Sequence, residues 1–455
     1  MRTFSSLTRL PQALLDTLSQ LQYKTMTPIQ ESTIPALLEG KDMIAQAKTG
    51  SGKTAAFGLP LIHAIETKNR KPQALILCPT RELADQVSKE LRRLARYKEN
   101  LKILTLCGGT PMRPQIASLE RGAHILIGTP GRIQDHLSRE TIPLKSIHLL
   151  VLDEADRMLD MGFYDAIKKI ISNLPKKRQG MLFSATYPEN IRKLSREILT
   201  DPLMVKVDTE RNDLAIREIG IVTENRSKEE TLLKVLKSFK PDTVIIFCNT
   251  KVQTVALADL LRERHFSALD LQGDLDQRER NETLLKFSNG TVRIMVATDV
   301  ASRGLDVKEV SMVVNYDLPH DPEVYTHRIG RTARAGAEGI AISLYQPGQK
   351  AKLLEMGPEI ELLSAEKLTV DKNFILQADM ATLCIDGGKK NKLRPGDILG
   401  ALSKEIGIPG TDIGKIDIFD FLAYVAIDKK SIRKAFEGLK KGKIKGRKFR
   451  VWWLD

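Results

Sequence analysis

The chain has 455 residues, which is too long for one hydrophobic core and predicts two or three domains. Its formal charge of +14 favours a polyanionic partner over the substrates of a plain metabolic enzyme, although a solvated basic surface is the simpler alternative. The four cysteines lack metal-ligand spacing and fit buried thiols in a reducing compartment. No apolar run approaches membrane-spanning length, so we expect a cytoplasmic protein with no membrane partner.

From residue 25 to about 207, short apolar runs alternate with helical stretches. The runs at 74–78, 125–128 and 149–152 are continuously apolar, which is typical of buried parallel strands. The pattern restarts after a polar stretch, with apolar runs at 243–248, 292–297 and 312–314. We therefore predict a first α/β domain over 1–207, a linker over 208–216 and a second α/β domain over 217–355.

A third domain is predicted over residues 365–455. Its pattern gives the order β-α-β-β-α-β, an α+β arrangement. It carries 19 Lys/Arg against 12 Asp/Glu, half of the chain's excess charge in a fifth of its length, which favours a dedicated RNA- or DNA-binding module. The predicted strands are 381–385, 415–419, 423–427 and 449–453, and the predicted helices are 394–406 and 429–439.

Two segments of the first domain are typical of nucleotide hydrolysis. In residues 47–54, glycines let backbone N–H groups surround phosphates, Lys53 reaches the terminal phosphates, and the Thr54 hydroxyl can bind magnesium. Residues 151–156 read as a buried strand that ends in three carboxylates, which can hold the metal and activate water. Together the two segments predict a nucleoside triphosphatase.

Further short motifs follow in a fixed order, and the ordered series leaves almost no room for coincidence. The series resembles the DEAD-box family of RNA helicases over residues 1 to about 350, although Ala47 replaces the first glycine of the strict phosphate-loop pattern. The C-terminal domain looks like the tail of the bacterial DbpA group. The resemblance implies an α/β fold with two tandem RecA-like parallel-sheet domains and a C-terminal RNA-recognition-motif-like domain. The motifs are residues 27–30, 79–84, 108–109, 129–132, 153–156, 184–186, 277–280, 297–299, 303–306 and 327–334.

The resemblance implies ATP and Mg²⁺ as cofactors and gives each residue of the nucleotide site a role. Gln30 would recognise adenine, Tyr23 would stack on the base, and Phe4 is left open between stacking and core packing. Asp153 and Thr54 would hold magnesium, and Glu154 would orient the attacking water. The implied ATP site is Tyr23, Gln30, Thr49, Gly50, Ser51, Gly52, Lys53, Thr54, Gly304 and Asp306. The residues implied to couple ATP binding to RNA binding are Asp156, Ser184, Thr186 and His327. For His327, a purely structural role in the site is the alternative.

Arg331 and Arg334 match the arginine fingers of the family, which stabilise charge on the γ-phosphate. Their spacing of three predicts that both lie on one helical face. A surface salt-bridge pair is the alternative. Fingers on the second domain would make hydrolysis depend on domain closure, and such contacts are worth about 10³–10⁵ in rate.

The resemblance also implies an RNA path across both α/β domains, made of residues that suit phosphate and sugar contacts. In the third domain Cys384 stands where an aromatic is expected, and Tyr424 fits the core as well as a stacking platform. We therefore expect its basic residues to bind RNA. The predicted RNA-binding residues are Arg81, Gly109, Thr129, Gly131, Arg132, Thr250, Gln277, Arg280, Thr298, Asp299, Lys389, Lys390, Lys392, Arg394, Lys443, Lys445, Arg447 and Lys448.

These patterns predict an RNA-dependent ATPase that locally unwinds short RNA duplexes. The resemblance to the DbpA group implies a hairpin of large-subunit (23S) ribosomal RNA as target, pre-ribosomal particles as partners and a role in large-subunit assembly; we expect a monomer. An ATP-gated RNA clamp with little unwinding turnover keeps the same motifs and stays open. The Gln30 motif and the DEAD residues disfavour a DNA helicase, and a metabolic phosphate-loop kinase leaves the second domain unexplained.

Overall fold

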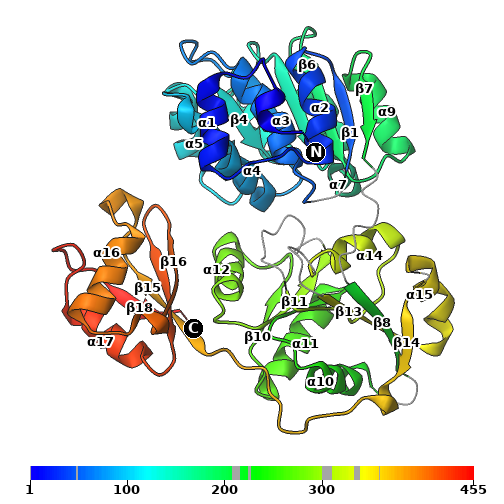
Figure 1. The fold of residues 1–455 in the computed structure, drawn as a ribbon, viewed down its shortest axis with the longest axis vertical. Helices are drawn as coiled ribbons and strands as arrows, with labels where there is room; N and C mark the ends of the chain where they lie inside the picture. Colours follow the sequence, from blue (N-terminus) through cyan, green and yellow to red (C-terminus); the bar gives the residue numbers. More distant parts are fainter. Residues whose placement is uncertain are drawn as a thin grey trace. The chain divides into compact units, whose positions relative to one another are not determined.

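The computed structural model describes residues 2–47, 50–207, 216–223, 227–299, 310–332, 339–357 and 359–454, apart from the side chain of Glu323. The chain divides into one unit made mainly of residues 1–212 and a second unit made mainly of the remainder (Figure 1). Most of the predicted linker lies outside the described residues, as do four predicted site residues: Thr49, Gly304, Asp306 and Arg334.

The first unit holds a seven-stranded sheet in the order β3-β4-β2-β5-β6-β1-β7, in which every recorded pairing is parallel. Three of its strands coincide with the continuously apolar runs in the sequence, which confirms the predicted parallel sheet. The strands are β1 Met43–Gln46, β2 Ala74–Leu77, β3 Ile103–Leu106, β4 Ile125–Gly128, β5 Leu149–Asp153, β6 Gln179–Ser184 and β7 Leu203–Lys206. The helices are α1 Gln12–Gln20, α2 Pro28–Leu38, α3 Lys53–Ala64, α4 Arg81–Leu94, α5 Met112–Glu120, α6 Pro130–Ser138, α7 Ala155–Asp160, α8 Tyr164–Ser172 and α9 Glu189–Ile198.

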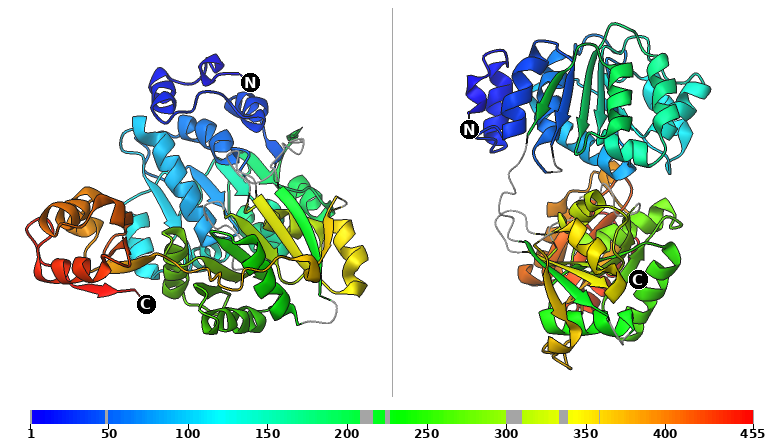
Figure 2. Two further views of the ribbon diagram at one scale, coloured as in Figure 1. Left: turned by 60° about the horizontal axis from the view of Figure 1, so that its bottom comes forward. Right: turned by 90° about the vertical axis from the view of Figure 1, so that its right-hand side faces the viewer.

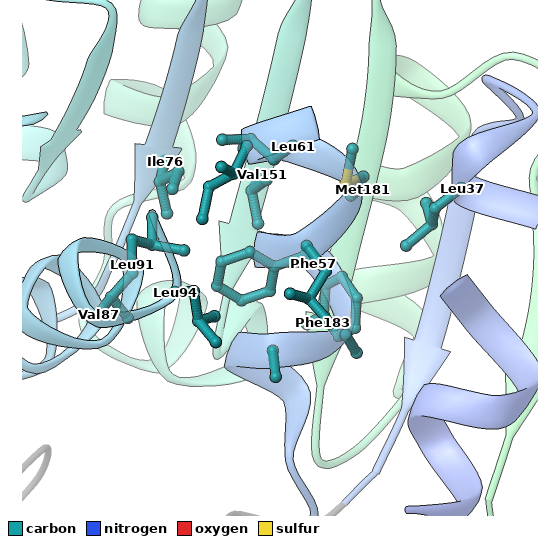
Figure 3. Packing of buried hydrophobic residues seen from close by; sticks show 14 of the residues in the cluster. Leu37, Phe57, Leu61, Ile76, Val87, Leu91, Leu94, Val151, Met181 and Phe183 are labelled. Atoms are coloured by element: carbon teal, nitrogen blue, oxygen red, sulfur yellow. The ribbon is translucent and has the colours of Figure 1, made fainter. Parts of the chain in front are cut away.

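Helices cover both faces of this sheet, so its strands are apolar on both sides (Figure 2). On one face, Phe57 of α3 packs against Phe183 of β6 with ring centroids 5.2 Å apart (Figure 3). Gly58 lets α3 approach α4 closely, because a Cβ there would lie 2.5 Å from Leu91. This packing fixes the start of α3, where the phosphate loop ends.

The second unit begins with another seven-stranded parallel sheet, in the order β10-β11-β9-β12-β13-β8-β14. Counted from its own first strand, this is the same order as in the first domain. The strands are β8 Ile216–Val222, β9 Val244–Cys248, β10 Ala268–Leu271, β11 Ile294–Thr298, β12 Met312–Asn315, β13 Gly339–Tyr345 and β14 Glu361–Ser364. The described helices are α10 Lys228–Phe239, α11 Lys251–Glu263, α12 Gln277–Ser288, α14 Pro322–Ile329 and α15 Lys350–Met356.

The C-terminal domain is a four-stranded antiparallel sheet in the order β16-β17-β15-β18, with two helical segments packed on one face. It has the predicted β-α-β-β-α-β order. The first helix changes to π-helical geometry over Ala401–Glu405. The elements are β15 Met380–Ile385, α16 Pro395–Gly400, β16 Ile413–Ile418, β17 Ala423–Asp428, α17 Ile432–Lys441 and β18 Val451–Trp453.

The other face of this small sheet packs against α12 of the second domain. Cys384 and Tyr424 form one buried cluster with Leu285, and Asn289 donates a hydrogen bond of 2.8 Å to the Thr382 hydroxyl. The structure also corrects the expected start of the third domain at residue 365. Residues 365 and 376 are buried in the core of the second domain, because the chain after β14 continues along that core before it reaches β15.

Candidate nucleotide and RNA sites

The phosphate loop connects β1 to α3 at the carboxyl edge of the first sheet. Gly50 and Gly52 have φ values of +85° and +93°, which only glycine adopts without strain. Lys53 is the first residue of α3; its side chain is buried, and Nζ donates to the Ala47 carbonyl at 3.0 Å. The Ser51 hydroxyl is buried without a hydrogen-bond partner among the described residues. The loop therefore folds on itself but leaves polar groups that phosphates could satisfy.

Gln30 connects α2 to this loop. Its Oε1 accepts the Thr27 N–H at 2.9 Å and its Nε2 donates to the Gly52 carbonyl at 3.1 Å, so both ends of the amide are engaged. A Cβ on Gly52 would collide with this amide, which is a second reason for glycine there. Adenine recognition by Gln30 stays a prediction, and it requires these contacts to open or to be shared.

The two predicted aromatics lie together beside α2. Phe4 and Tyr23 make an edge-to-face contact with centroids 6.1 Å apart. Phe4 is only 3% exposed and belongs to the core. The Tyr23 hydroxyl donates to Glu90 of α4 at 2.5 Å, and burial followed by this hydrogen bond raises its pKa. Core packing therefore accounts for Phe4, and the half-buried Tyr23 ring keeps a surface on which a base could stack.

Asp153 ends β5, at the same edge as the phosphate loop. It is 3% exposed, and its Oδ1 has no hydrogen-bond partner among the described residues. Burial raises the pKa of this carboxyl to about 7; Lys53 opposes the rise and Glu154 adds to it. Buried carboxylates normally have partners, so an orphaned one indicates that a cation or a water molecule completes the site.

Glu154 follows Asp153 in a left-handed conformation, with φ +53°, at the start of α7. Its Oε2 accepts a hydrogen bond of 2.7 Å from Nη1 of Arg157, and both side chains are almost fully buried. Sequence analysis did not single out Arg157. The signal was its spacing of three from Glu154, which lets a side chain in the first turn of α7 reach back to the residue that precedes the helix. The guanidinium holds the carboxylate in place.

Asp156 joins α7 to the end of β6. Its Oδ2 accepts hydrogen bonds from the backbone N–H groups of Ala185 and Thr186, both at 3.0 Å, and from the Thr186 hydroxyl at 3.2 Å. The Ser184 hydroxyl in turn accepts the Asp156 N–H at 3.3 Å. The acidic segment and the predicted coupling loop are therefore bonded directly, and no oxygen of Asp156 needs a metal.

The predicted RNA contacts of the first domain gather at the carboxyl ends of three neighbouring strands. Arg81 follows β2, Gly109 follows β3, and Thr129 follows β4 and precedes α6. Arg81 lies over Gly108, since a Cβ on that glycine would be 2.8 Å from Nη2. Arg132 donates to the Thr110 carbonyl at 3.0 Å. These contacts make one small polar surface at this edge.

The predicted contacts of the second domain occupy the equivalent edge, after β9, β10 and β11. Thr250 caps α11, Gln277 begins α12, and Thr298 ends β11. Asp299, however, forms a bidentate ion pair with Arg328, at 2.6 and 2.7 Å. Arg328 is 2% exposed and was not singled out from the sequence; its structural role explains why an arginine is buried there.

Arg331 does not lie in a helix, and Arg334 lies outside the described residues, so the expected shared face of the arginine fingers stays a prediction. Helix α14 ends at Ile329, and Arg331 lies beyond it. Thr332 forms a parallel bridge with Val310, and its hydroxyl donates to the Val310 carbonyl at 2.5 Å. Gly330 and this bridge follow the end of the helix. His327 lies in the last turn of α14.

In the C-terminal domain, two basic segments lie side by side. Lys445 Nζ donates to the Lys392 carbonyl at 3.1 Å and lies 3.4 Å from Asp397. This contact brings residues 443–448 to residues 389–394. The predicted RNA-binding side chains in both segments are exposed: Lys389, Lys390, Lys392, Arg394, Lys443, Lys445, Arg447 and Lys448.

Tandem parallel-sheet domains, a phosphate loop and an orphaned carboxylate are what a nucleotide-driven helicase core requires. Residues 27–194 match the DEAD/DEAH box helicase family, residues 227–336 match the helicase conserved C-terminal domain, and residues 382–452 match the DbpA RNA binding domain. The chain belongs to the DEAD-box family of ATP-dependent RNA helicases.

Similar proteins span almost the whole chain. The ATP-dependent RNA helicase DbpA of Escherichia coli (strain K12) is 50% identical over 453 residues, 99% of each chain. The ATP-dependent RNA helicase DbpA of Bacillus subtilis (strain 168) is 39% identical over 466 residues, 96% of each. The structure of S. cerevisiae Dbp5 bound to RNA and ADP BeF3 is 31% identical, with a TM-score of 0.72, and covers 80% of this chain and 96% of that one. No helix in the described ranges has the length and apolarity to cross a membrane.

Proposed function

We propose that this helicase unwinds short RNA duplexes locally and is directed by its C-terminal domain to a hairpin of large-subunit ribosomal RNA. It would act in the cytoplasm, as a monomer, on pre-ribosomal particles during assembly of the large subunit. The observation that carries the catalytic part is the buried, unpartnered oxygen of Asp153 beside a glycine-rich phosphate loop. The observation that carries the targeting part is the pair of adjoining basic segments in the C-terminal domain.

The nucleotide site fits Mg²⁺ together with ATP. No group of three or more His, Cys, Asp or Glu within the described ranges could hold a metal alone. Magnesium takes one or two protein ligands and completes its shell with phosphates and water, so Thr54 and Asp153 are sufficient. When bound, the ion would neutralise charge on the transferred phosphoryl group. Lys53 would release the Ala47 carbonyl and bind the phosphates instead.

The remaining roles belong to this chain's own side chains. Glu154 would orient the attacking water, held in place by Arg157. Asp156 would couple structural changes at the nucleotide site to the Ser184–Thr186 loop, because it accepts three hydrogen bonds from that loop. Arg331 and Arg334 would supply positive charge to the γ-phosphate when RNA and ATP are both bound, which would make hydrolysis depend on RNA.

The basic segments of the C-terminal domain provide its RNA surface because the other candidate surface is covered. Proteins of the RNA-recognition-motif type stack bases on an exposed sheet face. Here that face carries Cys384 and Tyr424, which are 1% and 7% exposed and pack with Leu285. The lysines at 389–394 and 443–448 instead point into solvent and favour phosphate contacts.

The test is the ATPase rate of the full chain with no nucleic acid, generic RNA, single-stranded DNA and a fragment of large-subunit ribosomal RNA. We expect the ribosomal fragment to stimulate most strongly. Lys389→Gln/Lys390→Gln should remove that preference, whereas Lys429→Gln/Arg433→Gln, at the opposite end of β17, should keep it.

Equal stimulation by every RNA would reject the ribosomal target, and stimulation by DNA would favour a DNA helicase. Stable trapping of RNA without release in a multiple-turnover unwinding assay would favour the clamp.

A further inference from the structure

The turn between β16 and β17 exposes two phenylalanines. Phe419 is 47% exposed and Phe421 is 67% exposed, more than any other phenylalanine in the described part of the chain. Single exposed apolar residues are normal on protein surfaces. Two exposed aromatic rings separated by one residue, in a domain with an excess of basic side chains, form a candidate binding surface.

This turn is held firmly against the basic segment 389–394. The Phe419 carbonyl accepts the Lys389 N–H at 2.8 Å, and the Asp420 carbonyl accepts the Lys390 N–H at 2.9 Å. Gly388 makes the close approach feasible, since a Cβ there would collide with the same two carbonyl oxygens. Backbone contacts therefore fix the turn that carries the rings against the segment that carries the lysines.

The two rings have different surroundings. Phe419 contacts Tyr424 edge-to-face, with centroids 5.6 Å apart and planes at 87°, so the covered sheet face supports it. Phe421 makes no ring–ring contact with any described residue, and it is 67% exposed, so much of its ring is accessible to a ligand. Asp420 is the single carboxylate between them, against the exposed Lys389 and Lys390 beside the turn.

We infer that this aromatic turn, residues 419–422, is a stacking platform for unpaired RNA bases. Phe421 stacks on one base, Phe419 supports it, and Lys389 and Lys390 bind the flanking phosphates. The inference rests on the proposed RNA-targeting role of this domain. It adds that the domain recognises nucleotides that lie outside a helix. Stacking suits this role because every base has a π face, whereas a base inside a duplex is already stacked. The turn thus replaces the aromatic surface that α12 covers.

The experiment measures binding of the full chain to two labelled RNAs by fluorescence anisotropy. One is a hairpin of large-subunit ribosomal RNA with an unpaired loop, and the other is the same stem as a blunt duplex. We expect Phe421→Ala to weaken binding to the looped hairpin about 5- to 150-fold, which is the range for loss of one base–aromatic stack. Binding to the blunt duplex should stay the same, and Phe421→Trp should restore the looped hairpin.

Two controls separate stacking from other causes. Leu399→Ala removes a 43% exposed apolar side chain from α16 of the same domain and should leave both affinities unchanged. Phe421→Ala should also keep the salt dependence of binding, whereas Lys389→Gln/Lys390→Gln should reduce its slope by about 1.4, because each lost phosphate contact removes about 0.7.

The outcomes are distinct. Unchanged binding of Phe421→Ala to the looped hairpin overturns the inference. If the lysine variant weakens the same binding, the targeting function stands without the stacking platform. If neither variant weakens it, both the inference and the proposed RNA surface of this domain are wrong. Equal losses on hairpin and duplex would also overturn the inference, because the turn would then not read unpaired bases.

Discussion

The two parallel-sheet domains share one strand order and differ in how they use the same edge. In each domain the first helix after the first strand begins with a lysine, Lys53 in α3 and Lys228 in α10. In the second domain, Lys228 pairs with Asp317 at 2.7 Å just after the fifth strand. In the first domain, Lys53 bonds a backbone carbonyl, and Asp153 at the end of the fifth strand keeps an unpartnered oxygen.

The same contrast extends to the rest of the edge. Arg328 in the second domain binds Asp299, Asn249 and the Asp317 carbonyl, so the polar groups there satisfy one another. The first domain instead leaves the Ser51 hydroxyl and Oδ1 of Asp153 without partners within its described residues. Since unsatisfied buried groups cost free energy, the first domain gives up stability to keep a site for a ligand, and the second domain gains stability at the equivalent place.

The largest effect should follow from Glu154→Gln, which tests whether the group that orients the attacking water belongs to the first domain. The amide cannot orient and deprotonate water as the carboxylate does, so we expect turnover to fall about 10²–10⁴-fold while ATP and RNA binding persist. Steady-state ATPase and equilibrium binding check this. Glu189→Gln breaks an exposed Glu–Arg pair of the same spacing and should leave turnover unchanged. Persistent ATPase activity would remove Glu154 from its assigned role.

The second prediction concerns the edge of the second domain. Arg328→Lys cannot keep the bidentate pair with Asp299 or the buried guanidinium's hydrogen bonds to Asn249 and Asn315, and the loss of this network should cost about 3–5 kcal/mol. Hydrogen exchange of peptides from the second domain measures the loss. Arg217→Lys alters an exposed bidentate pair with Glu361 in the same sheet and should cost less than about 1 kcal/mol. Equal costs would mean that the buried network does not stabilise this domain.

Sequence reasoning predicted the architecture because continuous apolar runs are visible without knowledge of their partners. The strands around Ile76, Val151 and Ile246 were predicted from such runs and lie in parallel sheets. Contacts between distant segments were not predictable in the same way. The helix expected to carry Arg331 ends at Ile329 because Thr332 pairs with Val310, a residue twenty-two positions earlier.

The same limit applies to the site. The phosphate loop and acidic segment are local motifs, so their residues were identified. Arg157 was missed because its role depends on burial beside Glu154, and Arg328 because its partners come from three separate segments. The aromatic turn was also missed, because the RNA-binding signature places aromatics on an exposed sheet face, and only packing against α12 shows that this face is covered.

The third prediction uses the raised pKa of Asp153. The folded protein holds this proton more tightly than the unfolded chain, so the contribution of Asp153 to the free energy of unfolding falls as pH rises from about 4 to about 7 and is constant above 7. Asp153→Asn removes that penalty, and we expect it to stabilise the nucleotide-free protein by about 2–4 kcal/mol at pH 8 and far less at pH 4. Thermal unfolding with a chelator present measures the difference.

A buried carboxylate with partners provides the control. Asp42 accepts the backbone N–H groups of Gly180 and Thr200, each at 2.7 Å, so Asp42→Asn should destabilise the same domain at pH 8. Destabilisation by Asp153→Asn at pH 8 would show that the carboxylate already has a stabilising partner, and the contrast with Asp317 would fail.

The smallest effect tests where the two domains are alike. Thr80 and Thr250 follow the second strand of their domains and cap α4 and α11, and each hydroxyl accepts a backbone N–H at 3.3 Å. Replacing either by Ala should cost about 1 kcal/mol, seen as faster hydrogen exchange in the first turn of that helix. Equal costs would show that the caps belong to the shared fold.

A larger cost at Thr80, which is 7% exposed, would measure its buried methyl group as well. If Thr250→Ala also weakens RNA binding while Thr80→Ala does not, the Thr250 hydroxyl contacts RNA in addition to capping its helix. The two sheet edges would then differ in function at this hydroxyl, although both use it as a helix cap.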